Sequence, residues 1–559
     1  MYATIAGTQP GIYRSDTSGA SWSAVNAGIA ATDLAGASSQ WVRLALGVGP
    51  DGLLSTLYAG FIAGGQLTQI YTSSTTNESW STIALPSGGS AAIHPGKQGY
   101  AKFAIGAHPT RPFLFVAGDG EIWRADLTDR STPDWKQVSG VADFAGANVP
   151  DGSPHTDYQA FVFDAAGDLL AGNDGGIYRL VGTATTTPKW LHLGWTMRNN
   201  EPLGVAYDTL ANVATVGSGD NGIAFEEGTG VRTWRQLHGG DGGAQGVDNH
   251  AADFSWRYGL QVETCTLSCL YRHKFDATNA QVTKDAAGHA VGGQLMMAAV
   301  RTPKIKFSGL GADANQGGAF ALNAVAADRL LLGAINVFES VDGGATVRKV
   351  LTRPLDRRGN PVSPGPLQMV CGGRANSADL AEVAYVGFGT QFWGRGAGAA
   401  SFSQVSGYAG GRINFVAMDP HDWTRVYVID NTHVYRSTTA GRSWDDCTGD
   451  LLSVVPDAQG AGQFGCMVVF RSGPADLVEA VVVGAQGGLY KTLNPGDGAG
   501  ANWSRFGGTL PRAVASDLKY HPAATRGGGT TGDVLVVGLQ GRGVWRLAGA
   551  SRYLTVPTR

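Results

Sequence analysis

Charged residues are scarce in this sequence, and no long apolar run is present. Only 16% of the residues are charged, and the 42 lysines and arginines nearly balance the 45 aspartates and glutamates. Without a basic stripe there is no electrostatic case for a nucleic-acid partner. No stretch approaches the roughly 18 to 20 apolar residues that a membrane helix needs. We therefore expect neither a nucleic acid nor a membrane as partner.

A secretion signal is also missing from the start of the chain. Strand-like sequence begins at Tyr2, with no charged segment followed by an apolar one. Either the protein is not exported or this chain starts after a removed leader. Of the two, we expect an extracellular or periplasmic protein whose leader is absent here.

Cysteine is rare, with five residues in the chain. Cys265 and Cys269 are close in sequence, and Cys447 and Cys466 flank one loop between expected strands. Two disulfides with Cys371 left over, or free buried thiols, fit this spacing equally well.

Glycine is the residue that the chain has in excess, with 83 copies. They follow no three-residue period, which excludes collagen, and short apolar runs separate them, which argues against disorder. Glycine at this density between short apolar runs indicates many tight turns joining many short strands.

One phrase recurs along the chain: an aliphatic strand ending near Gly, a turn, an apolar-aromatic-basic strand, and a Ser/Thr turn leading to Trp. The clear copies are YATIAGTQPGIYRSDTSGASW at 2–22, VYVIDNTHVYRSTTAGRSW at 426–444 and VVVGAQGGLYKTLNPGDGAGANW at 481–503. Weaker copies lie at 57–80, 113–125, 169–180, 330–347 and 534–547. Another short apolar strand precedes each copy.

Units of roughly 40 to 60 residues with four strands apiece predict the blades of a β-propeller. Stacked blades bury both faces of each small sheet and leave only short edges exposed. We therefore predict an all-β fold, a propeller of about ten or eleven four-stranded blades over residues 1–559. Two smaller propellers in tandem, 1–290 and 320–559, are the alternative.

At its turns the sequence resembles the Asp-box (BNR-repeat) superfamily, whose motif is Ser-x-Asp-x-Gly-x-Thr-Trp. The best copy consists of Ser340, Asp342, Gly344 and Thr346, with Val347 in place of the aromatic residue. Two further copies, Ser15–Trp22 and Ser437–Trp444, have Thr in place of Asp. The short polar side chain is expected to cap the turn, Gly to take a left-handed conformation and Trp to pack between blades. These residues are expected to be structural.

The middle of the chain is similar to the sortilin (VPS10)/xyloglucanase-like branch of that superfamily. The phrases that carry the similarity are PHTDYQAFVFD at 154–164, GNDGGIYRL at 172–180, GSGDNGIAF at 217–225 and GGDGGAQGVD at 239–248. The outer repeats match only through the general motif.

Polar residues at the start of innermost strands are the candidates for function, because these strands line a propeller's channel. We expect three such strands to be opened by His155 and Asp157, by Asn200 and Glu201, and by His238 and Asp241. Asp174 and Asp220 lie on turns near the same strands.

Two carboxylates at a suitable separation are what glycoside hydrolysis requires. The resemblance implies a catalytic Asp in a turn Thr-Asp-x-Gly-Gly-x-Tyr-Arg, which Asp174 matches, and a partner at the place of Asp157 or Asp241. The chain departs from that family in looking too short for two complete seven-bladed propellers, and in having Gln9 at the comparable turn of its first repeat.

The prediction is a carbohydrate-active enzyme, a glycoside hydrolase acting on a polysaccharide or oligosaccharide. Its expected catalytic residues are Asp157, Asp174, Asp241, His155 and His238, and its expected substrate-binding residues are Asp220, Asn200, Glu201 and Arg412. No cofactor is expected, apart from a structural Ca²⁺ ion that oxygen-rich side chains would hold.

Two other functions fit the same residues. In a sortilin-like propeller, a peptide or protein segment would bind in the channel, and Asp174 and Asp220 would merely cap their turns. A polysaccharide lyase would use arginines such as Arg412 to bind an acidic glycan. The separation of the carboxylates discriminates the enzyme from the binding protein.

Overall fold

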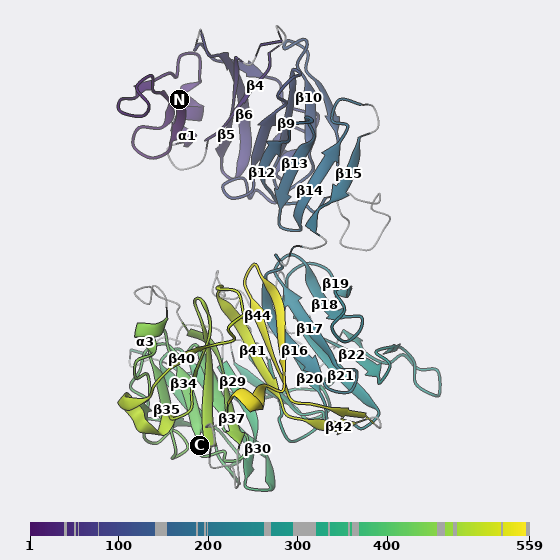
Figure 1. Cartoon of the computed structure of the whole chain (residues 1–559), viewed down its shortest axis with the longest axis vertical. Coiled ribbons are helices and arrows are strands. Elements are labelled where there is room, and N and C mark those ends of the chain that lie inside the picture. Colours follow the sequence, from purple (N-terminus) through teal and green to yellow (C-terminus); the bar gives the residue numbers. More distant parts are fainter. Residues whose placement is uncertain are drawn as a thin grey trace. The chain divides into compact units, whose positions relative to one another are not determined.

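The chain folds into two compact β-sheet units, Met1–Met197 and Arg198–Arg559, each described here by itself (Figure 1). This is a computed structural model of all 559 residues. It describes the chain except for residues 38–41, 50, 51, 54, 77, 140–153, 186, 187, 195, 196, 198, 262–269, 295–319, 334, 335, 356, 357, 360–367, 456–463, 473–477, 527, 528 and 555–559. No helix in the described part is long and apolar enough to cross a bilayer.

The first unit contains four antiparallel sheets that follow one another along the chain. The first sheet has three strands, β1 (Tyr2–Ile5), β2 (Gly11–Arg14) and β3 (Ser23–Ala24). The other three have four strands each: β4 (Val42–Gly47), β5 (Thr56–Ala63), β6 (Gln66–Ser74) and β7 (Ser81–Ile83); β8 (Ala104–Ala107), β9 (Phe113–Ala117), β10 (Trp123–Asp126) and β11 (Asp134–Gln137); β12 (Tyr158–Phe163), β13 (Leu169–Asn173), β14 (Gly176–Val181) and β15 (Lys189–His192). Their first strands contact one another in the order β1, β4, β8, β12.

In its described residues the second unit contains seven sheets of three or more strands, besides a two-stranded hairpin. They are β16 (Pro202–Asp208), β17 (Val213–Ser218), β18 (Gly222–Glu226) and β19 (Trp234–His238); β20 (Gly242–Asp248), β21 (Phe254–Gln261), β22 (Leu270–Asp276), β23 (Gln281–Val282) and β24 (Gly293–Gln294); β25 (Phe320–Leu322), β26 (Leu330–Gly333), β27 (Val337–Ser340) and β28 (Arg348–Leu351); β29 (Gln368–Ala375), β30 (Ala378–Phe388), β31 (Gln391–Arg395) and β32 (Ser403–Val405); β33 (Phe415–Met418), β34 (Val426–Ile429), β35 (Val434–Ser437) and β36 (Asp445–Asp446); β37 (Phe464–Ser472), β38 (Val478–Ala485), β39 (Gly488–Thr492) and β40 (Ser504–Phe506); β41 (Ala515–His521), β44 (Val534–Leu539) and β45 (Gly543–Ala548).

The short elements of the chain lie between these strands. They are the helices α1 (Ala31–Ala37), α2 (Ser90–Ile93) and α3 (Leu451–Val454), the 3₁₀ turns η5 (Pro495–Gly500) and η6 (Ala550–Tyr553), and a separate hairpin of β42 (Ala524–Arg526) and β43 (Gly529–Thr531).

The seven sheets of the second unit form a closed ring. The first strand of each sheet contacts the first strand of the next, and β41 of the last sheet contacts β16 of the first. Asp517 in β41 accepts a hydrogen bond from the backbone N–H of Val205 in β16 at 2.9 Å. Val205, Val534 and Val536 share one buried cluster across this junction. The ring therefore buries apolar residues where its two ends meet, which is how a propeller removes its sheet edges.

The repeated turns form as their sequences predict. In the turn after β35, the Ser437 hydroxyl accepts the Gly441 N–H at 2.9 Å, and the indole N–H of Trp444 donates to the Gly441 carbonyl at 2.8 Å. Gly441 has a φ of +85°, which favours glycine. The copies at Ser15 and Ser340 repeat the serine bond to glycine at 2.8 Å. A local hydrogen-bond network thus stabilises each turn.

The predicted all-β class with many four-stranded antiparallel sheets is confirmed. The two-propeller alternative places its break between residues 290 and 320, of which 295–319 lie outside the described part, whereas the two compact units divide at 197/198. The domain bounds stay a prediction.

The cysteines that the structure describes are free and buried. The Cys447 thiol donates to the Val434 carbonyl at 3.3 Å, and that of Cys466 to the Ala515 carbonyl at 3.7 Å. A Cys447–Cys466 disulfide is therefore not formed. Cys265 and Cys269 lie outside the described residues.

Candidate functional site

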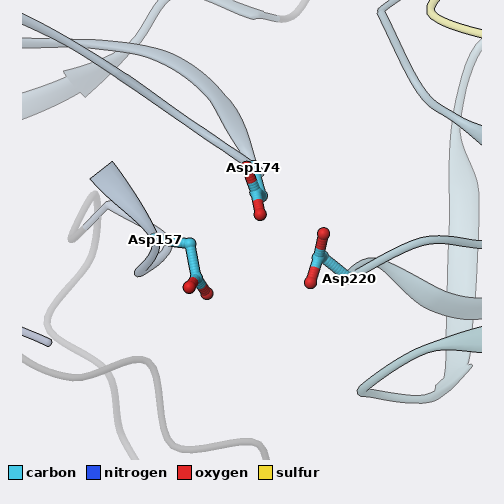
Figure 2. A group of neighbouring side chains, drawn as sticks. All are labelled: Asp157, Asp174 and Asp220. Carbon is cyan, nitrogen blue, oxygen red and sulfur yellow. The ribbon is translucent and has the colours of Figure 1, made fainter. Parts of the chain in front are cut away.

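Asp157 and Asp174 lie together in the first unit because of strand register. β12 and β13 are antiparallel, and Tyr158 at the start of β12 pairs with Asn173 at the end of β13. Asp157 comes directly before this pair and Asp174 directly after it, so both lie at the same end of the sheet. Their nearest carboxylate oxygens are within 4.8 Å of each other (Figure 2). Asp220, also labelled in Figure 2, belongs to the second unit and is described with it.

The Asp174 carboxylate is held by two side chains. The Lys102 ammonium forms an ion pair with Oδ2, and the Gln159 amide donates to Oδ1 at 2.6 Å. Lys102 lies just before β8, the first strand of the preceding sheet, and β8 contacts β12. Because first strands of adjacent sheets begin at the same end, the lysine reaches an aspartate 72 residues further along the chain.

The turn around Asp174 is capped by its neighbour. The Gly175 N–H donates to Asn173 Oδ1 at 3.0 Å, and the Asn173 amide donates to the His155 carbonyl. Asn173 thus performs the capping that the turn sequence predicts, while Asp174 binds Lys102 and Gln159.

Asp157 has a different environment from Asp174. Burial raises the pKa of its carboxyl, which the Thr156 hydroxyl bond and the Lys102 charge oppose. The Thr156 hydroxyl donates to Asp157 Oδ2 at 3.0 Å. Asp157 has a φ of +66°, a strained conformation for a residue other than glycine. A carboxyl whose pKa is raised by burial, beside one paired with an ammonium, is the kind of division that acid/base catalysis uses.

His155 contacts the same loop. Its Nδ1 lies 3.1 Å from the Thr156 carbonyl, and its own carbonyl accepts the Asn173 amide. Its ring packs near Gly175, where an added Cβ would meet the His155 Cβ at 2.4 Å. In this arrangement His155 supports the loop that holds Asp157 and the turn that holds Asp174.

The second unit repeats this construction with other residues. Asn200 and Glu201 lie before β16, and Asp220 follows β17, at the end where Pro202 pairs with Ser218. The Ser218 hydroxyl donates to Asn200 Oδ1 at 2.7 Å. The Asp220 N–H donates to the carboxylate of Asp241 at 2.7 Å, so Asp241 caps the Asp220 turn.

Two predicted residues lie at other strands of the second unit. Arg412 is half-buried just before β33, the first strand of its sheet. His238 was expected to open a first strand, but it ends β19, the outermost strand of its sheet. Strand β19 begins at Trp234 and continues as far as His238, so the chain leaves the strand only at Gly239. There His238 contacts His273 of the next sheet.

Lys102 and Gln159 were not among the site residues expected from the sequence. Strand alternation does not link Gln159 to Asp157, because Asp157 precedes β12 and has a φ of +66°. No sequence signal identifies Lys102, because it meets Asp174 only through the packing of adjacent sheets.

Comparison with known proteins shows the fold. No protein-family model matches the chain, and no curated protein matches it in sequence. Among solved structures, an ancestral GH74 enzyme is similar with a TM-score of 0.57 and 13% identity, over 97% of this chain and 76% of that one. A GH74 enzyme of Niastella koreensis has a TM-score of 0.33 and 14% identity, over 98% and 88%. The first likeness supports a β-propeller fold.

Proposed function

We propose that this protein is a glycoside hydrolase that acts on a polysaccharide, with Asp157 and Asp174 as its catalytic carboxylates. The observation that carries the proposal is the pair itself: two carboxylates within 4.8 Å, one with a raised pKa and one paired with Lys102. The structural likeness to a GH74 enzyme supports the same class. An extracellular or periplasmic location fits a polysaccharide substrate and is part of the proposal.

In the proposed reaction Asp157 is the general acid. Its burial favours the protonated carboxyl, which donates a proton to the glycosidic oxygen as the bond breaks. Asp174 acts as the negative partner, either activating water or attacking the anomeric carbon. The short separation of the pair favours direct attack, because a water between the carboxyl groups requires roughly 6.5–9.5 Å. Lys102 and Gln159 position Asp174.

The other expected residues have structural or substrate-binding roles in this proposal. Asp241 holds the Asp220 turn, and Asn200, Glu201 and Arg412 are proposed to contact substrate. A Ca²⁺ ion stays a prediction; at Asp174 it would compete with the Lys102 ammonium. The assignment to the Asp-box superfamily and its sortilin branch is likewise part of the proposal.

The test is hydrolysis of a polysaccharide panel that includes xyloglucan, other β-glucans and an acidic glycan. Asp157→Asn and Asp174→Asn are each expected to lower kcat at least 100-fold with the fold intact, because each removes a group that acts in the transition state. The matched control is Asp134→Asn, an exposed aspartate paired with Lys136, which is expected to keep wild-type rates.

Three results would contradict the proposal. Full activity in both Asp variants would remove these carboxylates from catalysis. An unsaturated product from the acidic glycan would show a lyase instead. Absence of turnover on every glycan, with capture of a peptide by the folded protein, would favour the sortilin-like function.

A further inference from the structure

His238 and His273 face each other across two neighbouring sheets of the second unit. His238 ends β19, and His273 lies in β22 of the next sheet. Their Nε2 atoms are 2.9 Å apart. Tyr271 stacks on the His238 ring with centroids 3.8 Å apart, which fixes the plane of that imidazole.

The hydrogen bonds define where the protons of this pair lie. The Gln281 amide nitrogen is 2.9 Å from Nδ1 of His273 and can only donate. Nδ1 of His273 is therefore an acceptor, and its Nε2 carries the proton that it donates to His238 Nε2. The two Nε2 atoms thus share one proton. Once that proton has moved elsewhere, each Nε2 offers a lone pair.

The pair lies at a small pocket that buried core residues, among them Ile223, Phe225 and Tyr258, also line. Both histidines are half-buried and line the pocket with Thr215, Gln245 and Arg257. The Arg257 charge is neutralised by Asp208, which its guanidinium contacts at 2.8 Å. The positive charge of Arg257 is therefore already paired and does not stand alone beside a cation bound at the imidazoles.

We propose that His238 and His273 bind a divalent transition-metal ion of the zinc or copper type through their facing Nε2 atoms, with water completing its coordination. Imidazole nitrogen suits zinc, copper and nickel, whereas calcium and magnesium prefer oxygen. Two nitrogens on a tetrahedral zinc at about 2.05 Å lie about 3.3 Å apart. The observed separation is 2.9 Å, and the hydrogen bond points the two Nε2 atoms at each other, so binding requires the rings to separate slightly and to turn until both lone pairs point at one ion.

Metal binding moves the shared proton within the histidine pair and releases none to solvent. The proton on His273 Nε2 moves to Nδ1, and the Gln281 amide turns so that its oxygen accepts that proton's hydrogen bond. Both imidazoles remain neutral, and no proton is released. Gln281 then acts as the positioning residue that fixes the metal-binding tautomer.

The bound ion would join the outer strand of one sheet to the third strand of the next. The expected consequence is a higher melting temperature with ZnCl₂, because an ion that binds only the folded state stabilises it. The binding can be tested separately from the proposed hydrolase activity, since both histidines belong to the second unit whereas Asp157 and Asp174 belong to the first.

The test uses the full chain with Zn²⁺ in thermal unfolding and Cu²⁺ in electron paramagnetic resonance. Wild-type protein is expected to gain several degrees in Tm at 100 µM Zn²⁺ and to show hyperfine coupling from two imidazole nitrogens with one equivalent of Cu²⁺. His238→Gln and His273→Gln are each expected to weaken binding at least tenfold. His289→Gln, an exposed histidine paired with Asp285, is the control and keeps wild-type binding.

Gln281→Glu gives a second readout, because a carboxylate accepts the Nδ1 proton more strongly than an amide oxygen. It is expected to tighten Zn²⁺ binding several-fold. The proposal is overturned if the two-nitrogen copper spectrum survives in the His238→Gln, His273→Gln double variant. It is equally overturned if Ca²⁺ or Mg²⁺ raises Tm as much as Zn²⁺ does.

Discussion

At the scale of single residues, Asp157 combines burial, a positive φ and a neighbouring positive charge. Its carboxyl is desolvated, which raises its pKa, while the Lys102 charge lowers it. The strain of a φ of +66° persists only where the surrounding structure holds the residue in place. Thr156 and the β12–β13 register supply that support.

Lys102→Met is predicted to move the alkaline limb of the pH–rate profile to higher pH. Removing the ammonium raises the pKa of Asp157 further, so the acid stays protonated and active at higher pH. The maximum rate is expected to fall about tenfold, because Asp174 loses its positioning partner. The measurement is kcat against pH, with Lys136→Met as the exposed control. An unchanged or acid-shifted limb would mean that Asp157 is not the acid.

At the scale of elements, the repeated turn is the same in each copy, but the packing of its tryptophan is not. Trp444 contacts Phe392 of the preceding sheet, with ring centroids 5.1 Å apart. Trp22 occupies the same place in the first sheet of the first unit and is 41% exposed. The sequence motif is shared, so the difference arises from the neighbouring sheet.

Trp444→Ala is therefore predicted to lower the free energy of unfolding by about 2 kcal/mol, somewhat less than the loss of a fully buried aromatic, because Trp444 is partly buried. Trp22→Ala is predicted to cost less than about 1 kcal/mol, because it removes little buried area. Urea unfolding of the two variants measures both values. Equal costs would show that the tryptophan acts within its own turn and not between sheets.

At the scale of the whole molecule, buried histidines make stability depend on pH. Burial lowers the pKa of His521 and of His238 to about 4, and lowers those of His108, His192 and His273 as well. In each case the unfolded chain binds the proton more readily, so stability is fully present above about pH 6.5 and is lost as the pH falls toward 4. The hydrogen bond to Asp248 raises the pKa of His250 instead, so its contribution to stability changes with pH in the opposite direction.

Tm is therefore predicted to fall steadily between pH 6.5 and pH 4.5. The half-buried His521, whose pKa burial lowers to about 4, alone accounts for up to roughly 3 kcal/mol, since one pKa unit corresponds to about 1.4 kcal/mol. His521→Leu should flatten part of this slope, whereas the exposed His289→Leu should not. If Tm changed with pH equally in both variants, His521 would not be a source of the pH dependence.

The sequence by itself determined the strands, their turns and their all-β arrangement. Local hydrogen bonds decide these features, as in the bond that the Gly441 N–H donates to the Ser437 hydroxyl, so a repeat read along the chain is enough. It also determined that Asp157 and Asp174 lie at one end of their sheet, because both flank paired strands.

Only the tertiary structure decided the remaining features. The closure of the ring of sheets in the second unit depends on the contact between β41 and β16, which lie more than 300 residues apart in sequence. The lysine that pairs with Asp174 and the histidine that faces His238 both come from an adjacent sheet. Packing between sheets sets these contacts, and no local pattern in the sequence encodes which side chain a neighbouring sheet will bring.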